Sequence, residues 1–170
     1  MRDGIQMALE KADKVQNSVL FSYSFRFDVR DLLPILTHPA DKKTIRVYWE
    51  QPSKGFSFAG LGSVLELHDT NKVHSQQVSQ KIKQIMDEGI SVSDHLLIGP
   101  RIVGGYAFNQ YIGNDDTWNK FPRTQFLLPE CLGTSTDDGT WLTISKMVKS
   151  VVNSLSIGSR PIVEIYNLLM

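Results

Sequence analysis

Residues 44–67 read TIRVYWEQPSKGFSFAGLGSVLEL, and this stretch decides the fold class. Apolar and polar side chains alternate through 45–50 and again through 56–60, which is the period of a β-strand with two different faces. The segment QPSKG at 51–55 supplies the proline and the glycine of a reversal. A third strand is predicted over 63–67, after the glycines at 60 and 62. We therefore predict a three-strand meander whose aromatic-rich face must be covered by another element.

The residues before and after this stretch predict helices and a further strand. Apolar residues recur at helical spacing through 5–15 and through 75–88, where Gly89 ends the pattern. Residues 21–27 alternate strictly between aromatic and polar side chains, which predicts a strand with its aromatic face toward the core. Between 28 and 40 we predict a short helical turn, stopped by Pro34 and Pro39.

Strand patterns dominate the rest of the chain. They cover 96–108, in two pieces around Gly99-Pro100, and then 123–132 and 140–148, with Asp137-Asp138-Gly139 as a turn. A long polar connection is predicted over 109–122. Together these elements predict an α+β fold with a largely antiparallel sheet and helices packed on one side.

The composition fits one soluble globular domain. The chain has 170 residues, 41% of them hydrophobic and 21% charged. Eighteen basic residues balance eighteen acidic ones, so no overall field favours nucleic acid or an anionic membrane as a partner. Cys131 is the single cysteine, which excludes an intrachain disulfide framework and suits a reducing compartment. The first residues lack an apolar signal core, and we expect a cytoplasmic protein.

The composition changes near residue 149. Serine, glycine and proline are frequent over 150–161, and the sequence then becomes apolar up to Leu168-Leu169-Met170. We therefore divide the chain into an N-terminal α+β scaffold region, 1–148, and a linker or the start of a missing C-terminal region, 149–170. An apolar end without a cap indicates a fragment of a longer protein.

Side chains that could carry chemistry show no recognisable spacing. The histidines are His38, His68, His74 and His95, and none stands at metal-ligand spacing. His68, Asp69 and His74 could be imagined as ligands, but loop histidines in solvent explain them better. The pairs Asp115-Asp116 and Asp137-Asp138 lie in turn contexts, where aspartate bonds to the local backbone.

The glycine pairs and the cysteine also favour structural roles. Gly60-Leu61-Gly62 and Gly104-Gly105 do not lead into a helix N-terminus, as a phosphate loop requires, and a bulge or close strand packing explains them better. Cys131 lies in a strand pattern without an evident histidine partner, which predicts an inert core thiol. We assign no catalytic, cofactor-binding or metal-binding residue.

Three segments nevertheless carry a resemblance to a known family. Residues 48–63, YWEQPSKGFSFAGLGS, resemble a segment of isochorismate synthases, within the chorismate-utilising enzymes that include anthranilate, aminodeoxychorismate and salicylate synthases. The strand at 21–27 with the turn at 31–36 is similar to the family's opening. Residues 100–108, PRIVGGYAF, followed by Trp118, Phe121-Pro122, Phe126 and Pro129-Glu130, resemble a later run. Asn109 departs from the family pattern, where an aspartate is expected. The ordered set spans most of 19–142.

The resemblance implies an enzyme that converts chorismate to isochorismate with Mg²⁺. In this family a lysine activates water, a glutamate protonates the leaving hydroxyl and further glutamates hold Mg²⁺, all in the C-terminal half. Lys146-Met147-Val148-Lys149 does not match the lysine motif, so no catalytic residue carries over. The implied fold is the first half of the anthranilate/aminodeoxychorismate synthase-like architecture, with its aromatic face packed against its own C-terminal half.

Two alternatives stay open at this point. One is another chorismate enzyme, of the anthranilate or salicylate synthase type, and the other is a non-catalytic stand-alone α+β binding module. The sequence does not separate the pathways, among them menaquinone and siderophore biosynthesis. If the chain is the first half, then alone it is expected to expose a large apolar surface, to self-associate and not to bind chorismate.

Overall fold

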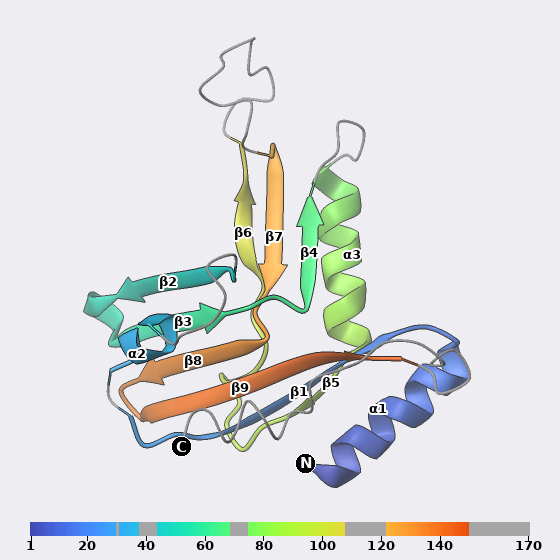
Figure 1. The fold of residues 1–170 in the computed structure, drawn as a ribbon, viewed down its shortest axis with the longest axis horizontal. Helices are drawn as coiled ribbons and strands as arrows, with labels where there is room; N and C mark the ends of the chain where they lie inside the picture. The colour runs from blue at the N-terminus through green and yellow to red at the C-terminus, as the bar shows by residue number, and fades with distance from the viewer. Residues whose placement is uncertain (30, 38–43, 69–74, 108–121, 150–170) are drawn as a thin grey trace.

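Six strands form the larger β-sheet, in the order β2-β3-β8-β9-β1-β5 (Figure 1). They are β1 (Val19–Arg26), β2 (Arg46–Gln51), β3 (Phe56–Leu61), β5 (Ile90–Val92), β8 (Cys131–Thr136) and β9 (Gly139–Val148). The neighbours pair antiparallel, apart from β1 with β5, which is parallel. The structure is a computed structural model that describes residues 1–29, 31–37, 44–68, 75–107 and 122–149.

A smaller antiparallel sheet runs across the end of the larger one. Its order is β4-β7-β6, with β4 at Leu65–His68, β6 at Val103–Tyr106 and β7 at Thr124–Leu128. In Figure 1 these strands stand upright above the horizontal strands of the larger sheet. The predicted α+β class with largely antiparallel pairing is therefore confirmed.

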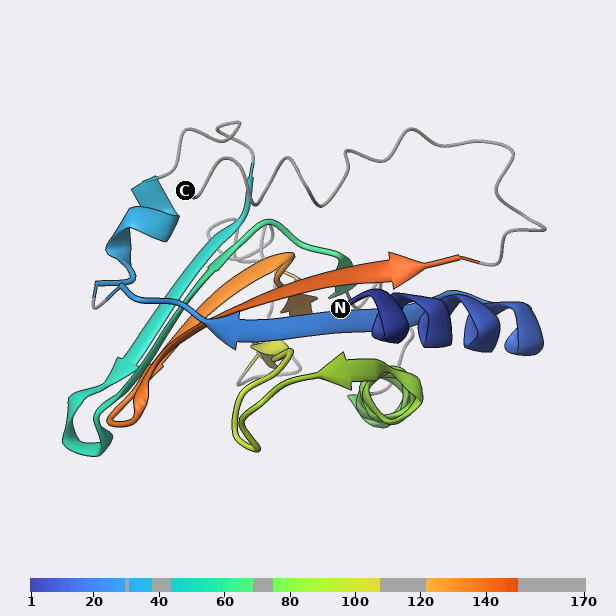
Figure 2. The ribbon, with the colours of Figure 1, turned by 90° about the horizontal axis from the view of Figure 1, so that it is seen from below.

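Helices cover both faces of the larger sheet. They are α1 (Arg2–Val15), α2 (Leu33–Thr37) and α3 (Ser75–Glu88), and a 3-10 turn spans Pro52–Lys54. Helices α1 and α2 share the face that carries Phe21 and Phe25, so the predicted packing on one side holds for these two helices but not for α3. Helix α3 lies on the opposite face, because Leu20 of β1 and Met147 of β9 make that face apolar as well (Figure 2).

Two buried clusters hold these layers together. On the α2 side, Leu32 and Ile35 pack against Ala59, Cys131 and Leu142 of the larger sheet. Gly133 allows this contact, because a Cβ there would lie 2.4 Å from the Ile35 side chain. On the α3 side the cluster consists of Leu20, Ile85 and Leu128, with Val64, Leu65, Met86, Ile102 and Met147 packed around them. Leu128 of β7 thus ties the smaller sheet to the larger one.

The predicted meander is correct in its first two strands and wrong in its third. Strands β2 and β3 pair antiparallel around the 3-10 turn, as the alternation predicts. The third strand exists as β4, but it pairs with β7 in the smaller sheet, and β8 is the second neighbour of β3. Gly62, at φ 70°, takes a left-handed conformation where the chain leaves the larger sheet.

Three other predicted boundaries also need correction. Residues 96–98 form no strand, since Leu96 and Leu97 are exposed and only β6 remains of the predicted 96–108 pattern. The predicted strand 123–132 is divided between β7 and β8, and Gly133–Thr136 belongs to β8 rather than to a loop. Pro34 does not stop a helix but lies in the first turn of α2, where no intrahelical N–H is required.

The other local predictions hold, with one strand missed. Helix α1, strand β1, helix α3 and the turn at Asp137-Asp138 agree with the patterns read from the sequence. Strand β5 was not predicted. Pro39 and the connection 109–121 lie outside the described residues, as does nearly all of the segment 149–170.

Candidate functional site

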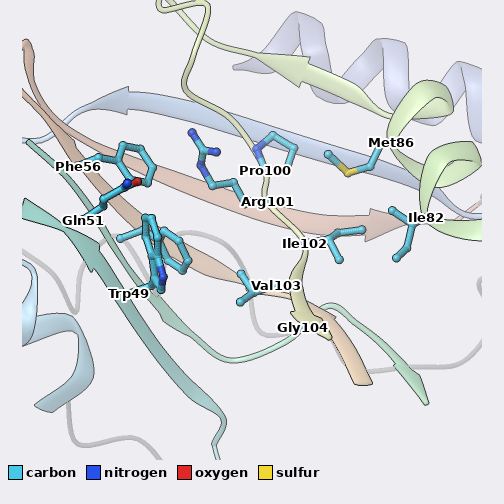
Figure 3. A pocket seen from close by; sticks show the side chains of 11 residues that line it. Trp49, Gln51, Phe56, Ile82, Met86, Pro100, Arg101, Ile102, Val103 and Gly104 are labelled. Atoms are coloured by element: carbon cyan, nitrogen blue, oxygen red, sulfur yellow. The ribbon is translucent and has the colours of Figure 1, made fainter. Parts of the chain in front are cut away.

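An open groove of about 780 Å³ lies on the α3 side of the larger sheet, between β2, β3, α3 and the segment that leads into β6 (Figure 3). Its lining residues are Trp49, Gln51, Phe56, Phe58, Ile82, Met86, Pro100, Arg101, Ile102, Val103 and Gly104. One end is aromatic and polar, and the other, toward α3, is aliphatic (Figure 3). Such a concave surface with few polar groups is the usual form of a small-molecule site.

The aromatic wall of the groove follows from strand pairing. Trp49 of β2 lies directly opposite Phe58 of β3, and Gln51 lies opposite Phe56, so the four side chains share one face. The rings of Trp49 and Phe58 stack at a centroid distance of 5.7 Å, and Trp49 meets Phe56 edge-on at 5.9 Å. Trp49 is 44% exposed, which leaves part of its indole available for contact with a ligand.

Arg101 brings a positive charge to this wall. Its guanidinium carbon lies 5.0 Å from the centroid of the Phe56 ring, a cation–π contact, and its Nη2 donates a hydrogen bond of 2.8 Å to the carbonyl of Leu97. Its Nε is buried and has no hydrogen-bond partner. No carboxylate in the described part of the chain forms an ion pair with it. Loss of water around the guanidinium lowers the pKa of Arg101.

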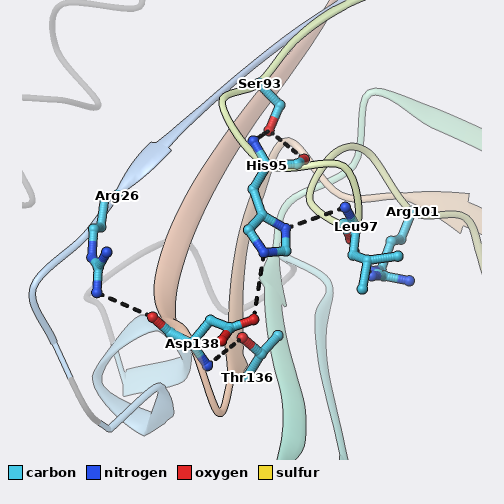
Figure 4. Close-up of polar contacts among 7 residues, drawn as sticks. All are labelled: Arg26, Ser93, His95, Leu97, Arg101, Thr136 and Asp138. Carbon is cyan, nitrogen blue, oxygen red and sulfur yellow. Dashed lines mark hydrogen bonds and ion pairs between the residues drawn. The ribbon is translucent and has the colours of Figure 1, made fainter.

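The segment that carries Arg101 is fixed to the sheet by His95 (Figure 4). The Nδ1 atom of His95 accepts a hydrogen bond from the backbone N–H of Leu97 at 3.2 Å, so Nε2 carries the proton of the neutral ring. This Nε2 lies 3.6 Å from Oδ2 of Asp138 in the β8–β9 turn, and the ring lies 4.8 Å from that of Trp141. These contacts hold the segment 95–101 over the face of β8 and β9.

The candidate residues considered in the sequence do not converge on one site. His68 forms an exposed pair with Glu66 at 3.1 Å, while His38, His74, Asp69 and Asp115-Asp116 lie outside the described residues. Asp137-Asp138 forms the predicted turn. Cys131 is buried, and this burial, with a smaller effect of the neighbouring Glu130, raises the pKa of its thiol to about 12. The prediction of an inert core thiol is therefore consistent with its environment.

Close packing explains Gly60 and Gly104, as predicted, but not Gly105, where a Cβ would have no neighbour within 4 Å. A Cβ on Gly60 would lie 2.7 Å from Cγ1 of Val47, and one on Gly104 would lie 2.0 Å from the backbone oxygen of Gln125. Neither position leads into a helix N-terminus. Both glycines let two chain segments approach more closely than a side chain would permit.

The described residues do not fit a magnesium site. Magnesium requires several oxygen ligands, and no cluster of three histidine, cysteine, aspartate or glutamate side chains occurs among the residues that the structure describes. Within those same residues, none of the helices has both the length and the apolar character that a membrane span requires.

Sequence reasoning missed the groove itself. Arg101 and Gly104 fall within the segment 100–108 that carries the family resemblance, but nothing in their spacing indicates that they face Trp49, which lies about fifty residues earlier. The alternation in β2 and β3 does place Trp49 and Phe58 on one face. The residues that complete the site come from distant elements, and local patterns do not specify such contacts.

Comparison with known proteins identifies the family. Residues 7–162 match the family model described as chorismate binding enzyme. Isochorismate synthase MenF of Bacillus subtilis (strain 168) is 26% identical over 155 residues, which are 86% of this chain and 33% of that protein. The Pseudomonas aeruginosa protein named salicylate biosynthesis isochorismate synthase is 23% identical over 128 residues, 75% of this chain and 26% of that protein.

One solved structure also aligns with most of this chain. The menaquinone-specific isochorismate synthase MenF from Escherichia coli aligns with 93% of this chain and 36% of its own, at a TM-score of 0.48 and 16% identity. The chain spans about a third of the length of the curated relatives it matches, or less. Because the family model covers most of the chain, the predicted resemblance is confirmed, and the chain belongs to the chorismate-binding enzyme family.

Proposed function

We propose that this chain is the N-terminal scaffold region of an isochorismate synthase. The observation that carries the proposal is the family match over residues 7–162, together with two curated relatives that are both named isochorismate synthases. The whole protein would convert chorismate to isochorismate with Mg²⁺ in the cytoplasm. Water would add at ring carbon 2 while the hydroxyl at carbon 4 departs, so that substrate and product are isomers.

In this proposal the reacting groups lie outside the chain. The described residues offer no magnesium cluster, and we assign no step of the reaction to them. Their role is to form a wall against which the rest of the enzyme packs. Three exposed apolar side chains outside the groove support such a contact; they are Tyr48 on edge strand β2, Leu96 and Leu97.

The test is product identification. The full-length protein that carries this chain is incubated with chorismate and magnesium chloride, and the products are separated by chromatography. Isochorismate is expected, and EDTA should abolish its formation. Formation of anthranilate in the presence of ammonia, or of salicylate with pyruvate, would assign the protein to another member of the family and overturn the proposal.

A second measurement tests whether this chain binds chorismate without the rest of the enzyme. Calorimetric titration of the 170-residue chain with chorismate and magnesium is expected to show no binding. Magnesium-dependent binding by this chain would contradict the assignment of the active site to the remainder of the enzyme. It would also favour a stand-alone binding module if the full-length protein proved inactive.

A further inference from the structure

Among the residues that the structure describes, no carboxylate forms an ion pair with Arg101, the cation in the groove. Its Nη2 is occupied by the carbonyl of Leu97, and its Nε is buried without a partner. Its Nη1 makes no hydrogen bond within the described residues, nor is it among the atoms buried without a partner. A partly desolvated guanidinium with an open donor edge is stabilised by an anion that forms charge-assisted hydrogen bonds with it.

The side chains around this cation restrict the kind of anion. The face of Phe56 lies under the guanidinium, and the partly exposed indole of Trp49 lies next to Phe56 along the same wall (Figure 3). Toward α3 the groove continues along Ile102 and Met86. Flat aromatic walls favour stacking with a planar ring, and the aliphatic end favours an apolar body over a second charge.

The groove is also held in place before any ligand arrives. The contacts of His95 with Leu97 and Asp138 fix the segment on which Arg101 stands, and strand pairing fixes the aromatic wall. Binding of a ligand would therefore require little further ordering of the protein in this part of the site.

From these observations we propose that the groove binds a small planar aromatic carboxylate. Its carboxylate would accept hydrogen bonds from the guanidinium of Arg101, and its ring would stack on the exposed face of Trp49. Benzoate is the simplest probe of this class. Benzyl alcohol keeps the ring without the charge, and cyclohexanecarboxylate keeps the charge without the flat ring.

The measurement is tryptophan fluorescence of the full-length protein that carries this chain. Subtracting the signal of the Trp49→Phe variant leaves the part due to Trp49, so that binding elsewhere does not contribute. Benzoate is expected to change this signal saturably, and both analogues should bind about ten-fold more weakly or worse. Arg101→Gln should weaken benzoate by about ten-fold or more, while Arg123→Gln, an exposed arginine outside the groove, should not.

Several outcomes would overturn this proposal. They are a Trp49 signal that benzoate does not change, equal affinity for benzoate and benzyl alcohol, and an unchanged affinity in Arg101→Gln. If Arg101→Gln does not fold, the comparison of the three probes on the wild-type protein still decides. Failure to convert chorismate would refute the proposed function and leave this result standing, because benzoate binding does not depend on turnover.

Discussion

Two neighbouring glycines in β6 allow a matched test of the packing that positions the groove. A Cβ on Gly104 would lie 2.0 Å from the backbone oxygen of Gln125 and 2.6 Å from Cα of Phe126, both in β7. A Cβ on Gly105 would have no neighbour within 4 Å. Alanine at the two positions thus changes the composition identically, but only at Gly104 does it meet backbone atoms, and only there is φ positive, at 158°.

The expected cost of Gly104→Ala follows from these distances. Real Cβ contacts are almost never shorter than 3.0 Å, so β6 has to move away from β7 by about 3.0 − 2.0 = 1.0 Å. Backbone atoms have no other rotamer to adopt, and such a shift breaks hydrogen bonds of the β6–β7 ladder. At about 1 kcal/mol for each bond, loss of two to four gives a destabilisation of about 2–4 kcal/mol. Gly105→Ala should be neutral or stabilise by up to about 1 kcal/mol.

Urea unfolding followed by circular dichroism measures both variants against the wild type. Gly104→Ala should lower the midpoint with an unchanged slope, and Gly105→Ala should not lower it. Because β6 directly follows Arg101 and Ile102, Gly104→Ala should also change the environment of Trp49 in the folded protein. Equal stability of the two variants would refute the inferred contact between β6 and β7.

Three further predictions concern the buried core. Leu128→Ala should cost about 2–5 kcal/mol, because Leu128 is fully buried where the sheets meet, whereas Leu33→Ala, 48% exposed, should cost less than about 1 kcal/mol in the same unfolding assay. Thr134→Val should leave the free energy of unfolding nearly unchanged, because the Thr134 hydroxyl is buried without a partner. Thr143→Val should lower it by about 1–3 kcal/mol, because it breaks a hydrogen bond of 2.8 Å to Ser24 of β1. Equal losses of stability in the two variants would contradict this. Cys131 should resist thiol reagents in the folded protein and react after unfolding. Since its folded pKa of about 12 lies above the unfolded value of about 8.5, stability should be fully present below pH 8.5 and should decrease from there toward pH 12, as alkaline unfolding curves would show.

Local periodicity was sufficient for the elements whose shape depends on their own residues. The 3.6-residue pattern predicted α1 and α3, and the two-residue alternation predicted β1, β2 and β3. Each of these segments is long enough to show its period, and each buries one face. Burial of one face is the property that such patterns report.

Strand partners could not be predicted in the same way. Leu65 of β4 pairs with Leu128 of β7, more than sixty residues later, although β3 is its predecessor in the chain. The short parallel strand β5 is three residues long and shows no period of its own. Its place beside β1 depends on tertiary contacts, and such contacts often override local propensity.

The groove illustrates the same limit for function. The alternation in β2 places Trp49 and Gln51 on one face, but the cation that meets them comes from a segment without regular structure. That segment is positioned by His95, for which the sequence indicated only that it does not stand at metal-ligand spacing. The family resemblance included Arg101 within its third segment but assigned it no role.

Two resemblance segments that are far apart in the sequence meet at one corner of the fold. The chain passes from the larger to the smaller sheet after β3, and it returns to the larger sheet before β8 (Figure 1). These two passages lie side by side. Leu61 pairs with Cys131, and the N–H of Val64 donates a hydrogen bond of 2.9 Å to the carbonyl of Leu128. Gly60 leaves room for this crossing, since a Cβ there would lie 2.8 Å from Pro129. The corner sets the direction of β6 and β7 relative to β2 and β3, and with it the width of the groove between them. Two of the segments that carry the resemblance therefore follow the joint between the two sheets.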